Sequence, residues 1–369
     1  MIIENDQQDF VQDSEGNKSI FILLKILFII LAIIIGYKLP PIYKLIEEIE
    51  MLFDNLILKS IERSIMDRKI RIEDIKPDPN YEYFCCFCGM GKEENLYVRE
   101  LINYYLSLGV TKFVLGDNNL PNTEKLSDVL QDYIKNGIVD IIDIIGSTIG
   151  QSDFYGNIYQ KYKNKCQWLT FFDFDEYLVI HDKYGKHISI QEYLTYNNFT
   201  HCDAILFNWL MYGDNGYIYY NNRPLMKRFT IPDYYNYENK FVKSIVRGNL
   251  TGKIFGKNNT CHQPNKKLSL CNSLGEKANY FSEAVSPPNF KNAFLMHFNT
   301  KTAEEYAQKI KRGYPGNHSE SPNKRIELFF VHNEFSLKKL KTFEKIFNIT
   351  FKKRFKNGYY TINFTENKI

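Results

Sequence analysis

Two carboxylates spaced two residues apart, directly after an apolar and aromatic run, are the part of this sequence best suited to chemistry. Asp173 and Asp175 follow Trp168–Phe172, and on an extended backbone such side chains point to the same side. Carboxylate oxygens suit hard cations such as Mg²⁺ and Mn²⁺, which keep positions open for water and substrate phosphates. The stretch therefore predicts a metal site that a nucleotide-sugar diphosphate would complete.

A plainer interpretation of the same pair is an ordinary strand end, where polar residues return the chain to water. An Asp-x-Asp sequence by itself occurs by chance in many proteins. An EF-hand calcium loop does not fit, because no glycine stands at its sixth position and no glutamate closes it. The preceding apolar run and the adjoining Glu176 favour the metal site over the strand end.

Composition predicts a globular protein without a nucleic-acid partner. The chain has 369 residues and a net charge of +4, with acidic and basic residues interspersed rather than gathered on a basic face. Among the seven cysteines, Cys86 and Cys88 are expected to be small buried residues, since no second pair with zinc-site spacing accompanies them. Cys261 and Cys271 flank a polar loop and are candidates for a local disulfide if this part lies in an oxidising compartment.

The N-terminal segment predicts a membrane anchor. Residues 1–18 form a polar, acidic tail, and within 19–38 the run Ile20–Tyr37 is apolar apart from Lys25, which is just long enough to cross a bilayer as a helix. A cleaved signal peptide fits less well, because acidic residues precede the run and no small-residue cleavage site follows it. A buried helix of a globular protein is the other alternative. Lysines lie on both sides, so charge does not set the orientation.

Residues 39–80 are predicted to form a stem with an amphipathic helix. Apolar residues recur there at heptad-like spacing, at Ile42, Leu45, Ile49, Leu52 and Leu56. Such a face either pairs with a second copy of the chain, giving a homodimer, or docks on the domain that follows.

The elements that would position the carboxylates begin near Tyr81. Strands are expected at Tyr83–Gly89, Lys112–Leu115, Val139–Ile144 and in the run before Asp173. Helices are expected between them, at Asn95–Leu108, around Thr123–Asn136 and at Asp153–Lys165. This alternation predicts an α/β domain with a mostly parallel central sheet over residues 81–320, followed by a C-terminal extension over residues 321–369.

Ligands of such sheets bind at the carboxyl ends of the strands, so polar residues there are expected to converge. Further elements follow in a characteristic order: Lys92-Glu93-Glu94, Tyr97–Tyr105, Gly116-Asp117-Asn118, Phe171–Tyr177, Lys243–Arg247, Met296–Lys301 and Lys309–Gly313. In order and spacing this string resembles glycosyltransferase family 92 and its relatives among the family-2-like GT-A transferases, over roughly Tyr83 to Gly313.

The resemblance implies a GT-A fold that uses a nucleotide-diphosphate sugar, most often a UDP-sugar, with Mn²⁺ or Mg²⁺. It implies that Asp175 contacts the metal directly, while Asp173 binds the ribose or reaches the metal through water. His297 is the third candidate metal ligand, with a structural histidine as the alternative.

The remaining candidates complete a site for an inverting transfer. Glu94 and Asp117 are expected at the mouths of the first two strands, where they would contact uridine or ribose; a capping or turn role is the alternative for Asp117. Lys243 and Arg247, four residues apart, would hold diphosphate oxygens. Asp214 is the candidate general base that deprotonates the acceptor hydroxyl, although a turn aspartate looks the same in sequence.

The leading hypothesis is thus a single-pass type II membrane glycosyltransferase of the Golgi or secretory pathway, acting on a glycan or glycoprotein. One alternative is a transferase at a cytoplasmic membrane face. Another is a membrane-anchored binding protein on a degenerate transferase scaffold, which stays open because the family usually has Lys-Asn-Glu where this chain has Lys92-Glu93-Glu94.

Overall fold

The computed structural model describes most of the chain after the predicted stem. The described residues are 75–182, 184–195, 199–256, 262–278, 280–281, 284–313, 322–356 and 359–366. The predicted tail, the predicted anchor and nearly all of the predicted stem lie outside these ranges. Within them, no helix is long and apolar enough to cross a bilayer.

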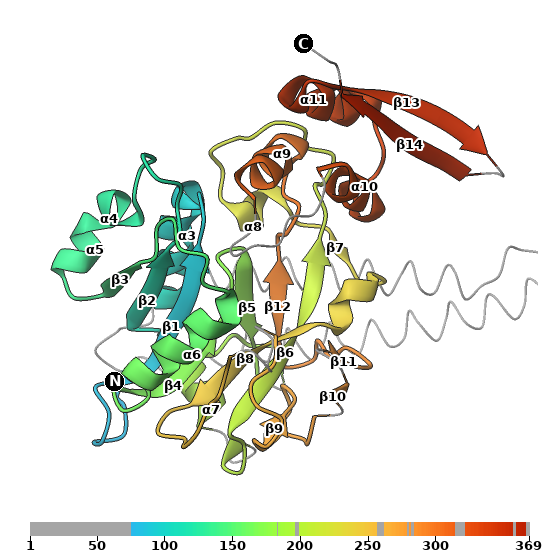
Figure 1. The fold of residues 1–369 in the computed structure, drawn as a ribbon. Coiled ribbons are helices and arrows are strands. Elements are labelled where there is room, and N and C mark those ends of the chain that lie inside the picture. The colour runs from blue at the N-terminus through green and yellow to red at the C-terminus, as the bar shows by residue number, and fades with distance from the viewer. Residues whose placement is uncertain are drawn as a thin grey trace, which may run out of the picture. The chain divides into compact units, whose positions relative to one another are not determined.

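A ten-stranded sheet forms the centre of the domain (Figure 1). Its first half is parallel, as expected, and runs in the order β3 (Val139–Asp143), β2 (Lys112–Asp117), β1 (Tyr83–Gly91) and β4 (Cys166–Phe171). The parallel order arises because helices return the chain to the same end of the sheet before each new strand.

The second half of the sheet is mixed, which corrects the expectation of a mostly parallel sheet. β8 (Val242–Arg247) is antiparallel to both β4 and β6 (Ala204–Tyr212). β12 (Ala293–His297) is parallel to β6 and antiparallel to β5 (Glu176–Ile180). The short strands β7 (Pro232–Asp233) and β9 (Leu270–Cys271) also pair with β6. Here the strands are joined by loops that carry only short helices, rather than by long crossover helices, and this explains the change of direction.

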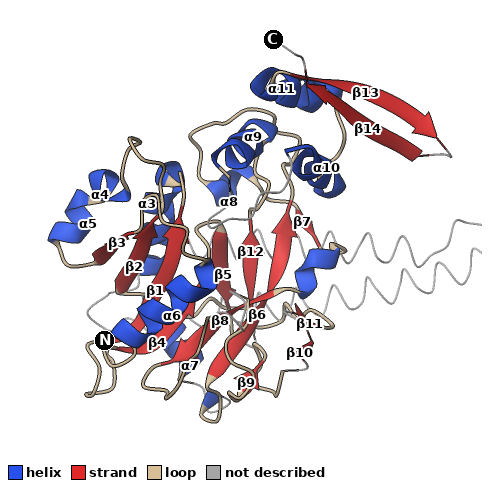
Figure 2. Cartoon of the chain, viewed as in Figure 1, coloured by secondary structure: helices blue, strands red, loops and turns tan. Residues whose placement is uncertain are grey.

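Two helices cover the two faces of the parallel half (Figure 2). α3 (Asn95–Ser107) packs Tyr105 against Phe87 and Phe172. α6 (Gln151–Tyr162) packs Tyr155 and its neighbours on the other set of strand residues, which includes Phe171. Alternate residues of β1 and β4 therefore supply two separate cores, as the two-residue period of a strand requires.

The expected helix around Thr123–Asn136 is split into α4 (Leu126–Val129) and α5 (Gln131–Lys135). The other elements are short or lie toward the C-terminus: α7 (Ile190–Leu194), α8 (Leu225–Arg228), η3 (Tyr237–Lys240), β10 (Tyr280–Phe281), β11 (Ala284–Val285), α9 (Ala303–Arg312), α10 (Pro322–His332), α11 (Leu337–Phe347), β13 (Ile349–Lys356) and β14 (Tyr359–Glu366).

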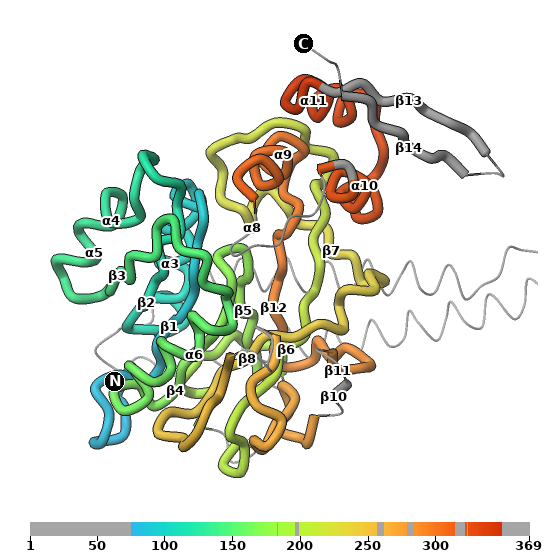
Figure 3. Tube along the Cα trace, viewed as in Figure 1, coloured from blue at the N-terminus to red at the C-terminus, as the bar shows by residue number. Residues whose placement is uncertain are grey.

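Figure 3 follows the chain from β12 into the three C-terminal helices. These helices share one apolar cluster, in which Tyr306 and Ile310 of α9 pack with Phe329 of α10 and Phe343 of α11. The C-terminal extension thus holds α9 from outside the sheet.

Among the described residues, two disulfides tie strands and loops of the domain. Cys86 of β1 bonds to Cys166 of β4, and Cys202 bonds to Cys271. The second bond corrects the expected pairing of Cys271 with Cys261, a residue outside the described ranges. A sequence cannot reveal that partner, because the two cysteines meet only when β9 pairs beside the start of β6.

Candidate active site

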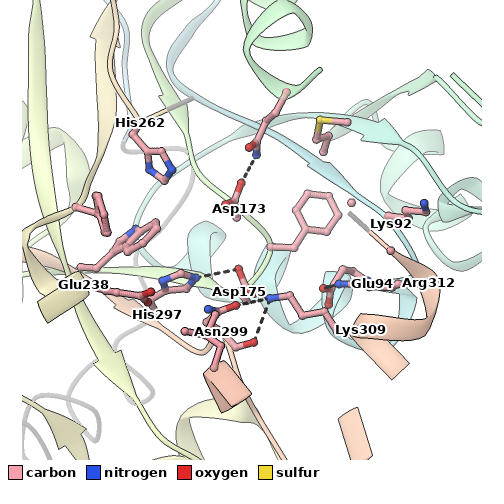
Figure 4. A pocket seen from close by; sticks show the side chains of 18 residues that line it. Lys92, Glu94, Asp173, Asp175, Glu238, His262, His297, Asn299, Lys309 and Arg312 are labelled. Carbon is pink, nitrogen blue, oxygen red and sulfur yellow. Dashed lines mark hydrogen bonds and ion pairs between the residues drawn. The ribbon is translucent and has the colours of Figure 1, made fainter. Parts of the chain in front are cut away.

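A cavity of about 380 Å³ opens at the carboxyl ends of β1 and β4. Its lining also includes residues of β6, β12, η3, α9 and α10, so distant parts of the chain meet there. Figure 4 shows the titratable side chains that face it. They are four carboxylates, three strongly basic side chains and two imidazoles: Glu94, Asp173, Asp175, Glu238, Lys92, Lys309, Arg312, His262 and His297.

The two predicted carboxylates lie in the connection between β4 and β5 rather than on a strand. β4 ends at Phe171 and β5 begins at Glu176, whose buried carboxylate Oε2 accepts a hydrogen bond of 2.8 Å from the backbone N–H of Asp173. Glu176 therefore fixes the connection, as its position suggested. Both Asp173 and Asp175 line the cavity.

A glycine permits this connection to pass close to β1. A Cβ atom at Gly91 would lie 2.5 Å from the ring of Phe174, which is far inside ordinary van der Waals contact. Only hydrogen at this position leaves the ring room between the two aspartates. The ends of β1 and β4 are thereby brought together at the cavity.

Asp173 is held by side chains beneath it. The Lys243 ammonium donates to its Oδ2 at 2.8 Å, and the Tyr155 hydroxyl donates to Oδ1 at 3.2 Å; Gln151 contacts Oδ1 as well. Burial would raise the pKa of Asp173, but the charge and hydrogen bond of Lys243, together with His297, lower that pKa on balance. Lys243 is itself fully buried and meets Asp173 rather than the open cavity.

Asp175 faces the cavity with a basic group on each oxygen. Lys309 donates to its Oδ2 at 2.8 Å and also to the carbonyl and side-chain oxygens of Asn299, at 3.1 and 2.7 Å. His297 Nε2 lies 3.6 Å from Oδ1. Burial alone would raise the pKa of Asp175, but Lys309 and His297 hold it well below its usual range. Asp175 is therefore ionised at neutral pH.

Two side chains, Asp175 and His297, are placed to bind a divalent ion, rather than the three that were predicted. Asp175 Oδ1 and His297 Nε2 are adjacent, and Nδ1 of the buried His297 has no hydrogen-bond partner among the described residues. One carboxylate oxygen and one imidazole nitrogen leave positions for water and phosphate oxygens, as Mn²⁺ allows. Asp173, the third predicted ligand, is turned toward Lys243.

A different set of three possible ligands lies elsewhere. Across the described ranges, His201, Cys202 and Cys271 are the only three such residues that come within metal-binding distance of one another. The two cysteines are joined in a disulfide, and a disulfide has no thiolate to offer a metal. We therefore assign no metal to that cluster.

One side of the cavity is strongly basic. Arg312 contacts Glu94 Oε1, and the Lys301 ammonium lies 3.4 Å from Glu94 Oε2. Burial would raise the pKa of Glu94, but Arg312 and Lys301 lower it. Lys92 stands nearby, and its pKa is lowered by partial burial and by the Arg312 charge. With Lys309, these side chains make this side of the cavity attractive to an anion.

The opposite side is aromatic. The ring centroids of Trp209 and His297 are 4.2 Å apart, and those of Trp209 and His262 are 5.1 Å apart. Burial, followed by the nearby Lys243 charge, lowers the pKa of His262 to about 3, so this imidazole is neutral. The Trp209 indole Nε1 is buried and finds no acceptor within the described part of the chain.

Comparison with protein-family models gives one match, described as glycosyltransferase family 92, over residues 81–341. That range is more than half of the chain. The chain belongs to glycosyltransferase family 92. Membership supports glycosyltransferase activity, and the α/β sheet with mixed strands fits the GT-A-like fold expected from the resemblance.

Solved structures add distant likenesses. The chain is similar to S. aureus TarS, with 14% identity and a TM-score of 0.29 over 44% of this chain and 28% of that one. It is also similar to the mannosyltransferase PcManGT from Pyrobaculum calidifontis, in complex with GDP-Man and Mn²⁺, with 11% identity and a TM-score of 0.25 over 42% of this chain and 45% of that one. The matches span less than half of either protein. No curated protein matches the chain.

Three residues that were predicted to belong to the site of this family 92 chain lie away from the cavity. Both oxygens of Asp117 accept backbone N–H groups, from Asn119 at 3.1 Å and Leu126 at 2.8 Å, which is the turn and capping arrangement weighed as its alternative. Arg247 stands at the far end of β8, where its guanidinium donates to the carbonyls of Cys202 and Phe199.

Asp214, the predicted base, is the third. It does not line the cavity; it pairs with the Lys339 ammonium at 2.6 Å and accepts the Gly216 N–H. This is a structural turn with a buried ion pair. The structure therefore gives Asp214 a structural partner and places it outside the cavity.

Several cavity residues received no role from the sequence. Lys309 and Arg312 come three residues apart on one face of α9, a spacing that a helix prediction after His297 could have used. Glu238 lies in a tyrosine-rich loop with no motif around it. His262 also stands outside any recognisable motif.

Proposed function

We propose that this chain transfers a sugar from a nucleotide-diphosphate sugar, and specifically a UDP-sugar, to a hydroxyl group of a glycan or glycoprotein, with inversion at the anomeric carbon. The observation that supports this most is the Asp175–His297 pair beside the basic side of the cavity. A diphosphate needs positive charge on several oxygens at once, and Lys92, Lys309 and Arg312 supply it there.

The residues divide the work of holding the donor. Asp175 and His297 would hold Mn²⁺ or Mg²⁺, which when bound neutralises charge on the departing diphosphate. Lys309 and Arg312 would draw diphosphate oxygens toward α9, on which both lie. Lys243 keeps Asp173 ionised at the cavity floor, where its free lone pairs suit a ribose hydroxyl or a metal-bound water.

We further propose that the domain lies in an oxidising compartment of the secretory pathway, as in a type II Golgi enzyme. Support comes from the apolar run within residues 19–38 and from the two disulfides, Cys86–Cys166 and Cys202–Cys271, since disulfides are rare in reducing compartments. Protease protection in intact microsomes tests this directly. Digestion of the domain without detergent would place it in the cytosol and contradict the proposal.

The test of activity uses the full-length chain in detergent with Mn²⁺, glycan acceptors and a panel of nucleotide-sugar donors, and it measures release of nucleoside diphosphate. We expect metal-dependent release from one donor, its loss in Asp175→Asn, and its retention in Asp132→Asn, a matched change at an exposed aspartate. Binding of UDP–Mn²⁺ without release from any donor would favour a binding scaffold. The absence of both UDP–Mn²⁺ binding and nucleoside diphosphate release would refute a nucleotide-sugar site.

A further inference from the structure

The four carboxylates of the cavity do not have equal partners. Glu94 pairs with Arg312, Asp173 with Lys243 and Asp175 with Lys309. Glu238, among the described residues, pairs with no lysine or arginine. The first three therefore serve charge balance and donor binding, whereas Glu238 keeps lone pairs for another task.

Glu238 is held in place by neutral or weakly basic groups. It lies on η3, where the Tyr237 hydroxyl donates to its Oε1 at 3.1 Å. His332 Nε2 lies 3.5 Å from its Oε2, an electrostatic contact outside hydrogen-bond geometry. The other His332 nitrogen, Nδ1, is 2.8 Å from the Asn236 side-chain amide, whose oxygen accepts the Glu238 N–H. The carboxylate is thus oriented without being neutralised by a fixed cation.

The position of Glu238 in the cavity suits an attack opposite the leaving group. Figure 4 shows it beside His297 on one side of Asp175, with Lys92, Glu94 and Arg312 on the other side. A diphosphate on the basic side would leave in that direction. An inverting displacement needs the acceptor hydroxyl on the opposite face of the sugar, which is the side where Glu238 stands.

We propose that Glu238 is the general base of the transfer, an inference that rests on the proposed function. One Glu238 oxygen takes the proton of the acceptor hydroxyl while that hydroxyl's oxygen forms a bond to the anomeric carbon. The bond between this carbon and the diphosphate oxygen breaks, and its electron pair leaves with the diphosphate. The proton stays on Glu238 until water removes it.

The same geometry gives the C-terminal extension a role. His332 is the last residue of α10, and Leu328 of the same helix lines the cavity. His332 is a positioning residue, since it acts on the acceptor only through Glu238. The acceptor side of the site therefore depends on a segment beyond residue 320.

The deciding experiment compares full-length wild type with Glu238→Gln, which keeps the shape but cannot accept the proton at a useful rate. Loss of a general base lowers kcat by about 10²- to 10⁴-fold, while UDP binding with Mn²⁺ should stay within about twofold because Glu238 lies away from the basic side. Glu327→Gln, the same change at an exposed position of α10, should keep wild-type transfer. Wild-type transfer in Glu238→Gln would overturn the inference.

Two further outcomes distinguish a failure of the proposed function from a failure of the base assignment. If wild type itself transfers no sugar, the proposed function fails and this inference falls with it. If Glu238→Gln also loses UDP–Mn²⁺ binding, its loss of transfer follows from donor binding, and the base assignment is overturned. For the positioning role, His332→Leu should lower kcat about tenfold at an unchanged donor KM, and His332→Gln, which restores an N–H donor, should recover most of it. An equal change in donor KM would contradict it.

Discussion

Replacement of Arg228 by methionine tests how the fold delivers α9 to the cavity. Arg228 on α8 donates from Nη1 and Nη2 to the two carboxylate oxygens of Glu305, at 2.7 and 2.9 Å. The side chains are only 1% and 6% exposed. Glu305 also closes the first turn of α9 with Thr302. The pair therefore fixes the helix that presents Lys309 to Asp175.

The expected magnitude follows from the burial of this pair. Arg228→Met leaves the Glu305 carboxylate buried without its guanidinium, and removal of one partner from a buried ion pair costs about 3–5 kcal/mol. Tyr97 and Thr302 still donate hydrogen bonds to Glu305, so we expect a loss of about 3 kcal/mol, near the lower end of that range. With an unfolding entropy of about 2.1 cal/mol/K per residue, this loss lowers the unfolding temperature of a 369-residue chain by roughly 4 °C.

Thermal unfolding of the full-length protein measures this, with Arg99→Met as the matched control. Arg99 makes the same two contacts with Asp132, both at 2.8 Å, but those side chains are 46% and 56% exposed, and water screens such a pair. We expect the control to unfold near the wild-type temperature. Adding Glu305→Gln to Arg228→Met should restore part of the loss, because no unpaired charge then remains. Equal effects of the two arginine variants, or no restoration, would refute the reasoning.

Three other perturbations have definite expected outcomes. Gly91→Ala places a methyl group 2.5 Å from the neighbouring phenylalanine ring and should weaken Mn²⁺-dependent UDP binding, measured by calorimetry, while Gly150→Ala, which meets nothing within 4 Å, should bind like wild type. His262 has a pKa of about 3 in the folded chain and about 6.5 when unfolded, so folding is favoured most above about pH 6.5, and this contribution falls as the pH drops. Between about pH 7.5 and 5.5, the free energy of unfolding in urea should fall by about 1.4 kcal/mol more in wild type than in His262→Phe. Equal losses in the two proteins would contradict that pKa. Cys202→Ser breaks the bond to Cys271 and should cost about 2–5 kcal/mol under non-reducing conditions; an unchanged urea midpoint would show that the bond is not formed.

Periodicity and strand-end chemistry sufficed to predict the parallel half of the domain and the placing of Asp173 and Asp175 at its edge. Each of those strands is a continuous apolar run followed by polar residues, and each crossover helix returns the chain to the same edge. The mixed half was missed because its strands are joined by irregular loops, whose course depends on contacts far apart in sequence. β6 illustrates this, since it pairs with β8 through Ala204–Asn208 and with β12 through Trp209–Met211.

Roles assigned by spacing failed where direction along a strand mattered. Lys243 and Arg247 do share a strand, but four residues of strand span about 13 Å. Lys243 therefore reaches Asp173, while Arg247 lies at the opposite end of the strand. Asp214 and Glu238 could not be ranked as bases from sequence, because the first lies in a turn and the second in a short helical turn, η3, and neither stands in a distinctive motif. Only the fold shows that Lys339 pairs with the first and that the second faces the cavity.

The pairing of charges explains how one cavity can hold so many of them. An unpaired buried carboxylate is costly, and Asp173, Asp175 and Glu94 each meet an ammonium or guanidinium group that keeps them ionised. Those same cations are the groups that a diphosphate attracts, so the donor would enter a site whose charges are already in place. Glu238 has no such partner among the described residues and is contacted instead by Tyr237 and His332. Donor binding and proton transfer are thereby assigned to carboxylates that differ in their partners rather than in their chemistry.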